Sequence, residues 1–65
     1  MRGTIKSVKG ERGFAFISGE DQEDYFLHCR DFSIPMEDAY PGLEVVFEGE
    51  DGPKGMRARR ARPVE

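Results

Sequence analysis

Glycine and proline interrupt this chain every few residues, and their spacing constrains the fold more than any other feature of the sequence. Eight glycines and four prolines are distributed over 65 residues. No window of about 11 residues or more follows the helical period of about 3.6 residues. The short apolar runs between the turn residues instead predict β-strands, so we expect a small all-β domain.

Five of these runs have the composition of strands and are separated by turns of different length. The expected strands are Thr4–Lys9, Phe14–Ser18, Tyr25–Cys29, Glu44–Gly49 and Met56–Pro63. Tight connections are expected at Gly10–Gly13, at the acidic run Gly19–Asp24 and around Asp51–Gly55. One long connection, Arg30–Gly42, follows the third strand. This order predicts a five-stranded antiparallel Greek-key barrel of the OB type, whose closure removes exposed strand edges.

The size and the cysteine content indicate one small domain, residues 1–65, that folds around an apolar core alone. The single cysteine, Cys29, has no partner for a disulfide and belongs to no cluster of metal ligands, so we expect no metal and no cofactor. The chain has no apolar run of about 20 residues that would span a membrane, and its N-terminus lacks the apolar stretch of a signal peptide. We therefore expect a cytoplasmic protein that makes no membrane contact through this chain.

The net charge of −3 hides an uneven distribution along the chain. Residues 1–19 carry four basic and one acidic side chain, residues 20–53 carry one basic and eleven acidic, and residues 54–65 carry five basic and one acidic. A partner responds to the local field rather than to the sum. The two basic ends are therefore compatible with a nucleic-acid partner, although the chain as a whole is acidic.

Alternation along the strands predicts which side chains form the core. The inward positions are expected to be Ile5, Ala15, Ile17, Tyr25, Leu27, Leu43, Val45 and Phe47. Val8 is out of phase with Ile5, which predicts a bulge in the first strand. Each aliphatic side chain removed from water is worth about 1.5–3 kcal/mol, so this register is favoured. It leaves four residues outside, namely Phe14, Phe16, Phe26 and His28.

Two features of this register leave questions open. An alternative interpretation of the exposed rings is that they form a second small core beneath the long connection 30–42. Tyr25 is large for an inward position, and its hydroxyl needs a hydrogen-bond partner or an exit to solvent.

Two motifs in the chain resemble those of the cold-shock domain family. "GFAFI" (13–17) is similar to its first ribonucleoprotein motif and "DYFLHC" (24–29) to its second, and "MRGTIK", "EVVFE" and "GPKGMRA" fit the layout around them. In that family, outward aromatic side chains stack on unpaired bases, and nearby basic side chains contact phosphates. The resemblance implies nucleic-acid contacts from Lys6, Arg12, Phe14, Phe16, Asp24, Phe26 and His28.

The basic stretch 54–62 offers further phosphate contacts, with Lys54 and Arg57 as the predicted ones. On a regular strand, Arg57 and Arg59 would share one face with Ala61. The alternative is that this stretch is a solvated edge that balances the acidic middle of the chain.

The chain also departs from the family pattern. Ser7 and Val8 stand where the family has tryptophan and phenylalanine, and Cys29 replaces an aromatic residue of the second motif. Three stacking residues are therefore missing, and each base–aromatic contact is worth about 1–3 kcal/mol.

These features favour a single-stranded RNA or DNA binder that acts as an RNA chaperone or a regulator of gene expression. The alternative is a protein–protein interaction module, or the N-terminal domain of a longer protein, with weak or lost nucleic-acid binding. We expect no enzyme, because His28 and Cys29 would point to opposite faces of one strand. A monomer is expected, while a dimer, a protein partner and the choice between RNA and DNA stay open.

Overall fold

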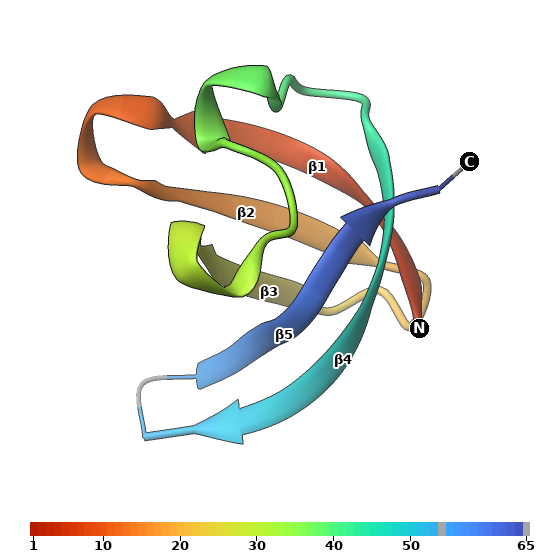
Figure 1. Cartoon of the computed structure of the whole chain (residues 1–65). Coiled ribbons are helices and arrows are strands. Elements are labelled where there is room, and N and C mark those ends of the chain that lie inside the picture. The colour runs from red at the N-terminus through yellow and green to blue at the C-terminus, as the bar shows by residue number, and fades with distance from the viewer. Residues whose placement is uncertain (54, 65) are drawn as a thin grey trace.

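The computed structural model describes residues 1–53 and 55–64. The described residues form five strands and three short 3-10 helices, and no helix among them is long and apolar enough to cross a membrane. The elements are β1 (Arg2–Lys9), η1 (Gly10–Arg12), β2 (Phe14–Gly19), β3 (Asp24–His28), η2 (Cys29–Asp31), η3 (Met36–Asp38), β4 (Glu44–Gly52) and β5 (Gly55–Pro63). All five expected strands are present, and no strand end lies more than three residues from its predicted position (Figure 1).

The strands close into a barrel in the order β1-β2-β3-β5-β4, and β4 pairs back to β1. The predicted all-β barrel of five strands is therefore confirmed. Four of the neighbouring pairs are antiparallel, whereas β3 and β5 are parallel and pair through Phe26 with Arg57 and Leu27 with Ala58. The expectation of antiparallel pairing thus needs one correction. Five strands in a closed ring cannot alternate direction throughout, so one pair must run parallel.

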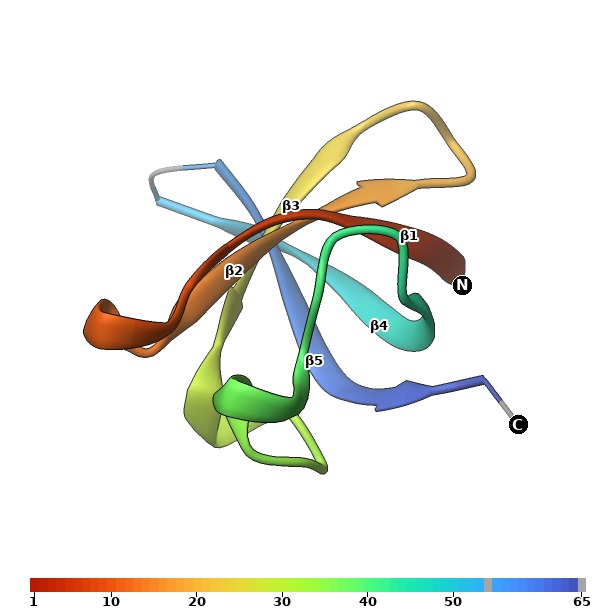
Figure 2. The ribbon, with the colours of Figure 1, turned by 90° about the horizontal axis from the view of Figure 1, so that it is seen from above.

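The core confirms the predicted register. Ile17 and Leu27 are fully buried, and Ile5, Ala15, Tyr25, Val45 and Phe47 are buried with them. Leu43 is only partly buried and packs against this cluster. Four members of the buried hydrophobic cluster were not predicted: Phe32, Met36, Ala58 and Ala61. Phe32 and Met36 come from the connection between β3 and β4, which crosses over the barrel in the view from above (Figure 2).

Two bulges change the alternation of side chains. In β1 the register shifts between Ile5 and Ser7, as the position of Val8 predicted. In β5 the register shifts opposite Val46 and Glu48, and Arg60 has a positive φ of 54°. The extra residue moves Ala61 to the inner face, where it is buried like Ala58. The prediction that Ala61 shares a face with Arg57 and Arg59 is therefore wrong.

Tyr25 fits inside the barrel because two glycines leave room for its ring. A Cβ atom on Gly19 would lie 2.8 Å from one edge of the ring, and one on Gly49 would lie 2.9 Å from the other edge. The hydroxyl donates a hydrogen bond to the Asp21 carboxylate. This bond, together with desolvation, raises the pKa of Tyr25 to about 12, and it lowers the pKa of Asp21. The inward tyrosine therefore has the polar partner that it requires.

Candidate nucleic-acid interface

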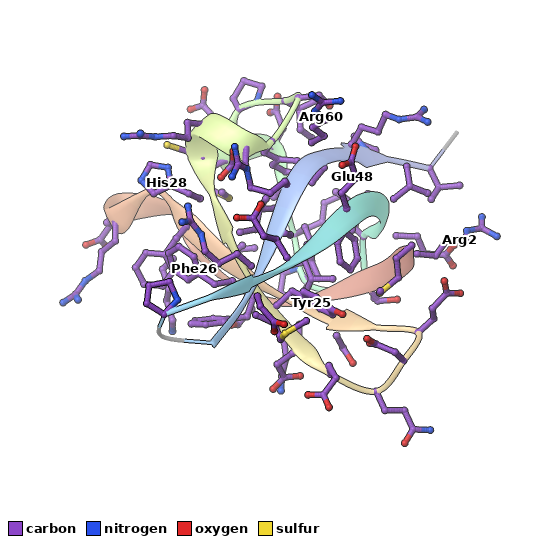
Figure 3. All side chains as sticks on the ribbon, turned by 90° about the horizontal axis from the view of Figure 1, so that it is seen from below. Arg2, Tyr25, Phe26, His28, Glu48 and Arg60 are labelled. Atoms are coloured by element: carbon purple, nitrogen blue, oxygen red, sulfur yellow. The ribbon has the colours of Figure 1, made fainter. Side chains whose placement is uncertain are left out.

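Three phenylalanine rings lie in mutual contact on the outer surface of β2 and β3. The ring centroids of Phe14 and Phe26 are 5.2 Å apart, those of Phe14 and Phe16 are 5.6 Å apart, and those of Phe16 and Phe26 are 5.9 Å apart. Phe14 pairs across the strands with His28, and Phe16 pairs with Phe26, so all four side chains share one face. We call these four residues the aromatic face; Figure 3 shows Phe26 and His28 on the same side of the barrel.

The aromatic face is partly exposed and lies outside the core. Its four side chains have intermediate exposure, and none belongs to the cluster of buried residues. The long connection instead contributes Phe32 and Met36 to that cluster. The alternative of a second core beneath residues 30–42 is therefore not what the structure has. The prediction that these rings stay outside is confirmed, whereas their contact with nucleic acid stays a prediction.

The pairing register extends the aromatic face across neighbouring strands. Ser7 of β1 is opposite Phe16, and Arg57 of β5 is the partner of Phe26. Lys9 is exposed and is opposite Phe14, in the same row as His28. Lys9 is missing from the predicted site, although the sequence held the signal. If Val8 points inward, both of its neighbours must point outward.

A hollow of about 320 Å³ adjoins one edge of the aromatic face. Phe16 and Phe26 line it on one side. The other side is formed by Pro53, which follows β4, and by the first residues of β5, Gly55, Met56 and Arg57. The lining is mainly apolar, with one guanidinium at its border. Such a surface suits a flat, partly polar ring such as a nucleobase.

The cations predicted from the sequence have different surroundings. Lys6 lies in the bulge of β1, and its Nζ is 3.1 Å from the Asp24 carboxylate. Both side chains are more than half exposed, so this pair is open to exchange with solvent. Arg12 is exposed in η1. Arg57 borders the aromatic face, and its Nη2 is 3.8 Å from Asp31. Lys54, also predicted, lies outside the described residues.

Two further arginines of β5, Arg59 and Arg60, form ion pairs with acidic side chains. Arg59 Nη1 lies 3.1 Å from Glu50, and Arg59 Nε lies 3.3 Å from Asp31. Arg60 Nη1 lies 3.7 Å from Glu48, and the two residues are labelled close together in Figure 3. These contacts support the alternative that part of the basic stretch balances the acidic middle of the chain.

His28 has a defined orientation at the end of β3. Its Nδ1 accepts a hydrogen bond of 3.2 Å from the backbone N–H of Arg30, so the neutral ring carries its proton on Nε2. Cys29 was expected on the opposite face of the same strand, and this is wrong. β3 ends at His28, and the turn of η2 places Cys29 Sγ 3.7 Å from Nδ1. The acceptor position of Nδ1 is already occupied by Arg30.

A closed five-stranded barrel with an aromatic outer face and flanking cations defines a nucleic-acid-binding barrel of the OB type. Comparison with known proteins agrees. The sequence model of the 'Cold-shock' DNA-binding domain matches residues 1–64. The chain therefore belongs to the cold-shock domain family, whose members bind single-stranded nucleic acids and are in general not enzymes.

Several curated relatives cover nearly the whole chain. A cold shock-like protein CspC of Bacillus cereus is 40% identical, and the match spans 89% of this chain and 91% of the relative. Cold shock protein 2 of Lactiplantibacillus plantarum is 35% identical over 94% of both chains. Cold shock protein CspA of Staphylococcus aureus is 39% identical over 88% of both chains. The matched regions thus make up most of each relative's length as well as most of this chain.

Proposed function

We propose that this chain binds single-stranded RNA or DNA by stacking unpaired bases on Phe14, Phe16, Phe26 and His28. The observation that carries the proposal is that the three phenylalanine rings contact one another, remain partly exposed and stand outside the core. Every base has a π-face, so such a surface captures bases with little sequence preference. One barrel of this kind holds about 4–8 nucleotides.

The cations around the aromatic face supply the phosphate contacts in this proposal. Lys6, Lys9 and Arg57 come from β1 and β5, on the two sides of the ring cluster, and Arg12 lies in the turn before β2. Lys54 is proposed as a further contact on sequence grounds alone. Asp24 forms an ion pair with Lys6 and offers its second carboxylate oxygen to a base edge.

Capture of unpaired bases gives the chain a way to act on RNA structure. Binding to an unpaired segment and not to a hairpin shifts the equilibrium toward the unpaired state by mass action. The shift requires no energy source and no catalytic group. We therefore propose an RNA chaperone or a regulator of gene expression.

The test is a titration of a fluorescent oligothymidine of about seven nucleotides at low salt, with the double variant Phe14→Ala/Phe16→Ala beside the unmodified chain. Two stacked bases contribute about 2–6 kcal/mol if their effects add, so affinity should fall at least about 30-fold. Val46→Ala, on the outer surface of β4, is the matched control. Thermal melting shows that each variant is folded.

Unchanged affinity in the folded double variant would contradict the stacking account. It would favour binding by charge, or the alternative of a protein-interaction module. A measurement of chemical shifts during the same titration locates the contacts, and we expect the largest changes on β2 and β3.

A further inference from the structure

The carboxylate of Asp31 lies between two arginines of β5. Its oxygens are 3.8 Å from Arg57 Nη2 and 3.3 Å from Arg59 Nε. The Asp31 side chain is 13% exposed, whereas the arginine side chains are 40% and 45% exposed. The acid is therefore fixed in the surface, and the two cations above it remain accessible to solvent and to a ligand.

Arg57 is the arginine of this pair that borders the aromatic face. Its Cα is the register partner of Phe26, and its side chain lines the hollow beside Phe16 and Phe26. Arg59 has a second acidic partner, Glu50, at 3.1 Å. Among the described residues, Arg57 forms an ion pair with Asp31 alone. Removal of the Asp31 charge would therefore release Arg57 and leave Arg59 still paired.

A phosphodiester and a carboxylate compete for the same guanidinium. Both are anions that accept hydrogen bonds from its planar set of N–H donors. When a phosphate takes Arg57, the Asp31 charge stays within a few ångströms of the new anion, in a position that is mostly buried and therefore weakly screened. Each phosphate contact made through Arg57 must overcome both the existing pair and this repulsion.

We infer that Asp31 is an internal brake on nucleic-acid binding, because it occupies Arg57 at the edge of the aromatic face. The inference rests on the proposed function and adds a residue that limits affinity. The brake sets how many phosphates the surface neutralises, and so it also sets the dependence of binding on salt. Contact with bases on the rings is unaffected by it.

The test compares Asp31→Asn with the unmodified chain in titrations of oligothymidine over a range of salt concentrations. One additional phosphate contact steepens the slope of log K against log salt by about 0.7 for a single strand. Taken alone, that contact raises affinity about eightfold at about 50 mM salt and about threefold at about 200 mM. Asp31→Ser makes the same change of charge if Asp31→Asn does not fold.

Two controls separate release of Arg57 from a general change in charge. Glu44→Gln removes one negative charge beside Arg2, which Figure 3 places on the side away from Phe26 and His28. The salt slope of oligothymidine binding by this variant should equal that of the unmodified chain. Asp31→Asn in an Arg57→Gln background should bind no more tightly than Arg57→Gln alone. A gain of affinity that survives in this background would overturn the inference.

The remaining outcomes distinguish the brake from the proposed function. If the unmodified chain binds and Asp31→Asn has the same affinity and the same salt slope, the inference about Asp31 is wrong and the proposed function stands. If only Asp31→Asn binds, the brake is supported, and the proposed function is wrong for the unmodified chain. If neither binds, both are wrong.

Discussion

Ser7→Trp tests whether the aromatic face is incomplete on β1. Ser7 is the register partner of Phe16, so a side chain at this position lies on the outer surface next to that ring. Its neighbour Val8 is opposite Ala15 and packs against the core, so the face that Ser7 occupies is not needed for the barrel. A tryptophan here should extend the stacking surface by one ring without disturbing the interior.

The expected gain follows from the worth of one stacked base. Base–aromatic stacking contributes about 1–3 kcal/mol, which corresponds to an affinity increase of about 5- to 150-fold. The increase should persist at high salt, because stacking neutralises no phosphate and so leaves the salt slope unchanged. This feature distinguishes it from the effect expected at Asp31, which weakens as salt is added.

The chain contains no tryptophan, so the variant reports its own binding. Oligothymidine stacked on the new indole should quench its emission, and anisotropy of a labelled oligonucleotide gives the affinity of the unmodified chain on the same scale. Val46→Trp is the control, because it is also charge-neutral and lies on the outer surface of β4, away from β2 and β3 in the ring of strands. A folded Ser7→Trp protein with the affinity of the unmodified chain would refute the placement of the stacking surface.

Two further predictions concern stability. In the folded chain the hydrogen bond to Asp21 raises the pKa of Tyr25 to about 12, above its ordinary value of about 10. The hydroxyl therefore contributes fully to the free energy of unfolding below about pH 10, and this contribution is lost as the pH rises toward 12. Tyr25→Phe should abolish this alkaline loss in urea-unfolding measurements, and an unchanged pH profile would contradict the assignment. Ile17→Val should lower the free energy of unfolding by about 0.5–1.5 kcal/mol and leave the oligonucleotide Kd unchanged, because Ile17 is fully buried. Weaker oligonucleotide binding with an unchanged free energy of unfolding would contradict the placement of Ile17 on the inner face.

The part of the fold predicted from sequence is the part that depends on local alternation. Ala15 and Ile17 alternate with Phe14 and Phe16 in one strand, and Leu27 alternates with Phe26 and His28 in the next, so burial of the aliphatic side chains identifies the inner face. Phe32 and Met36 have no such period, since they enter the core from an irregular connection. Their burial depends on where that connection crosses the barrel, which no short window of sequence contains.

The bulge of β5 explains why Ala61 was assigned to the wrong face. A single extra residue at Arg60 changes the phase of everything after it, and arginine carries no sequence signal for a positive φ. The contact between Asp31 and Arg57 is likewise invisible to local reasoning, because it arises only when β5 pairs with β3. Sequence motifs locate the rings, but only the closed barrel shows which cations already form ion pairs with acidic side chains.

The inner and outer residues of β2 explain how so small a chain maintains an exposed aromatic face. Ala15 and Ile17 are fully buried, and they hold Phe14 and Phe16 on the opposite surface because successive side chains of a strand alternate. A slip of one residue would bury the phenylalanines and expose the aliphatic side chains, at the cost of both the core and the site. Core packing therefore specifies the binding surface, although the two share no side chain. Substitutions at the inner positions should act on stability and those at the outer positions on affinity.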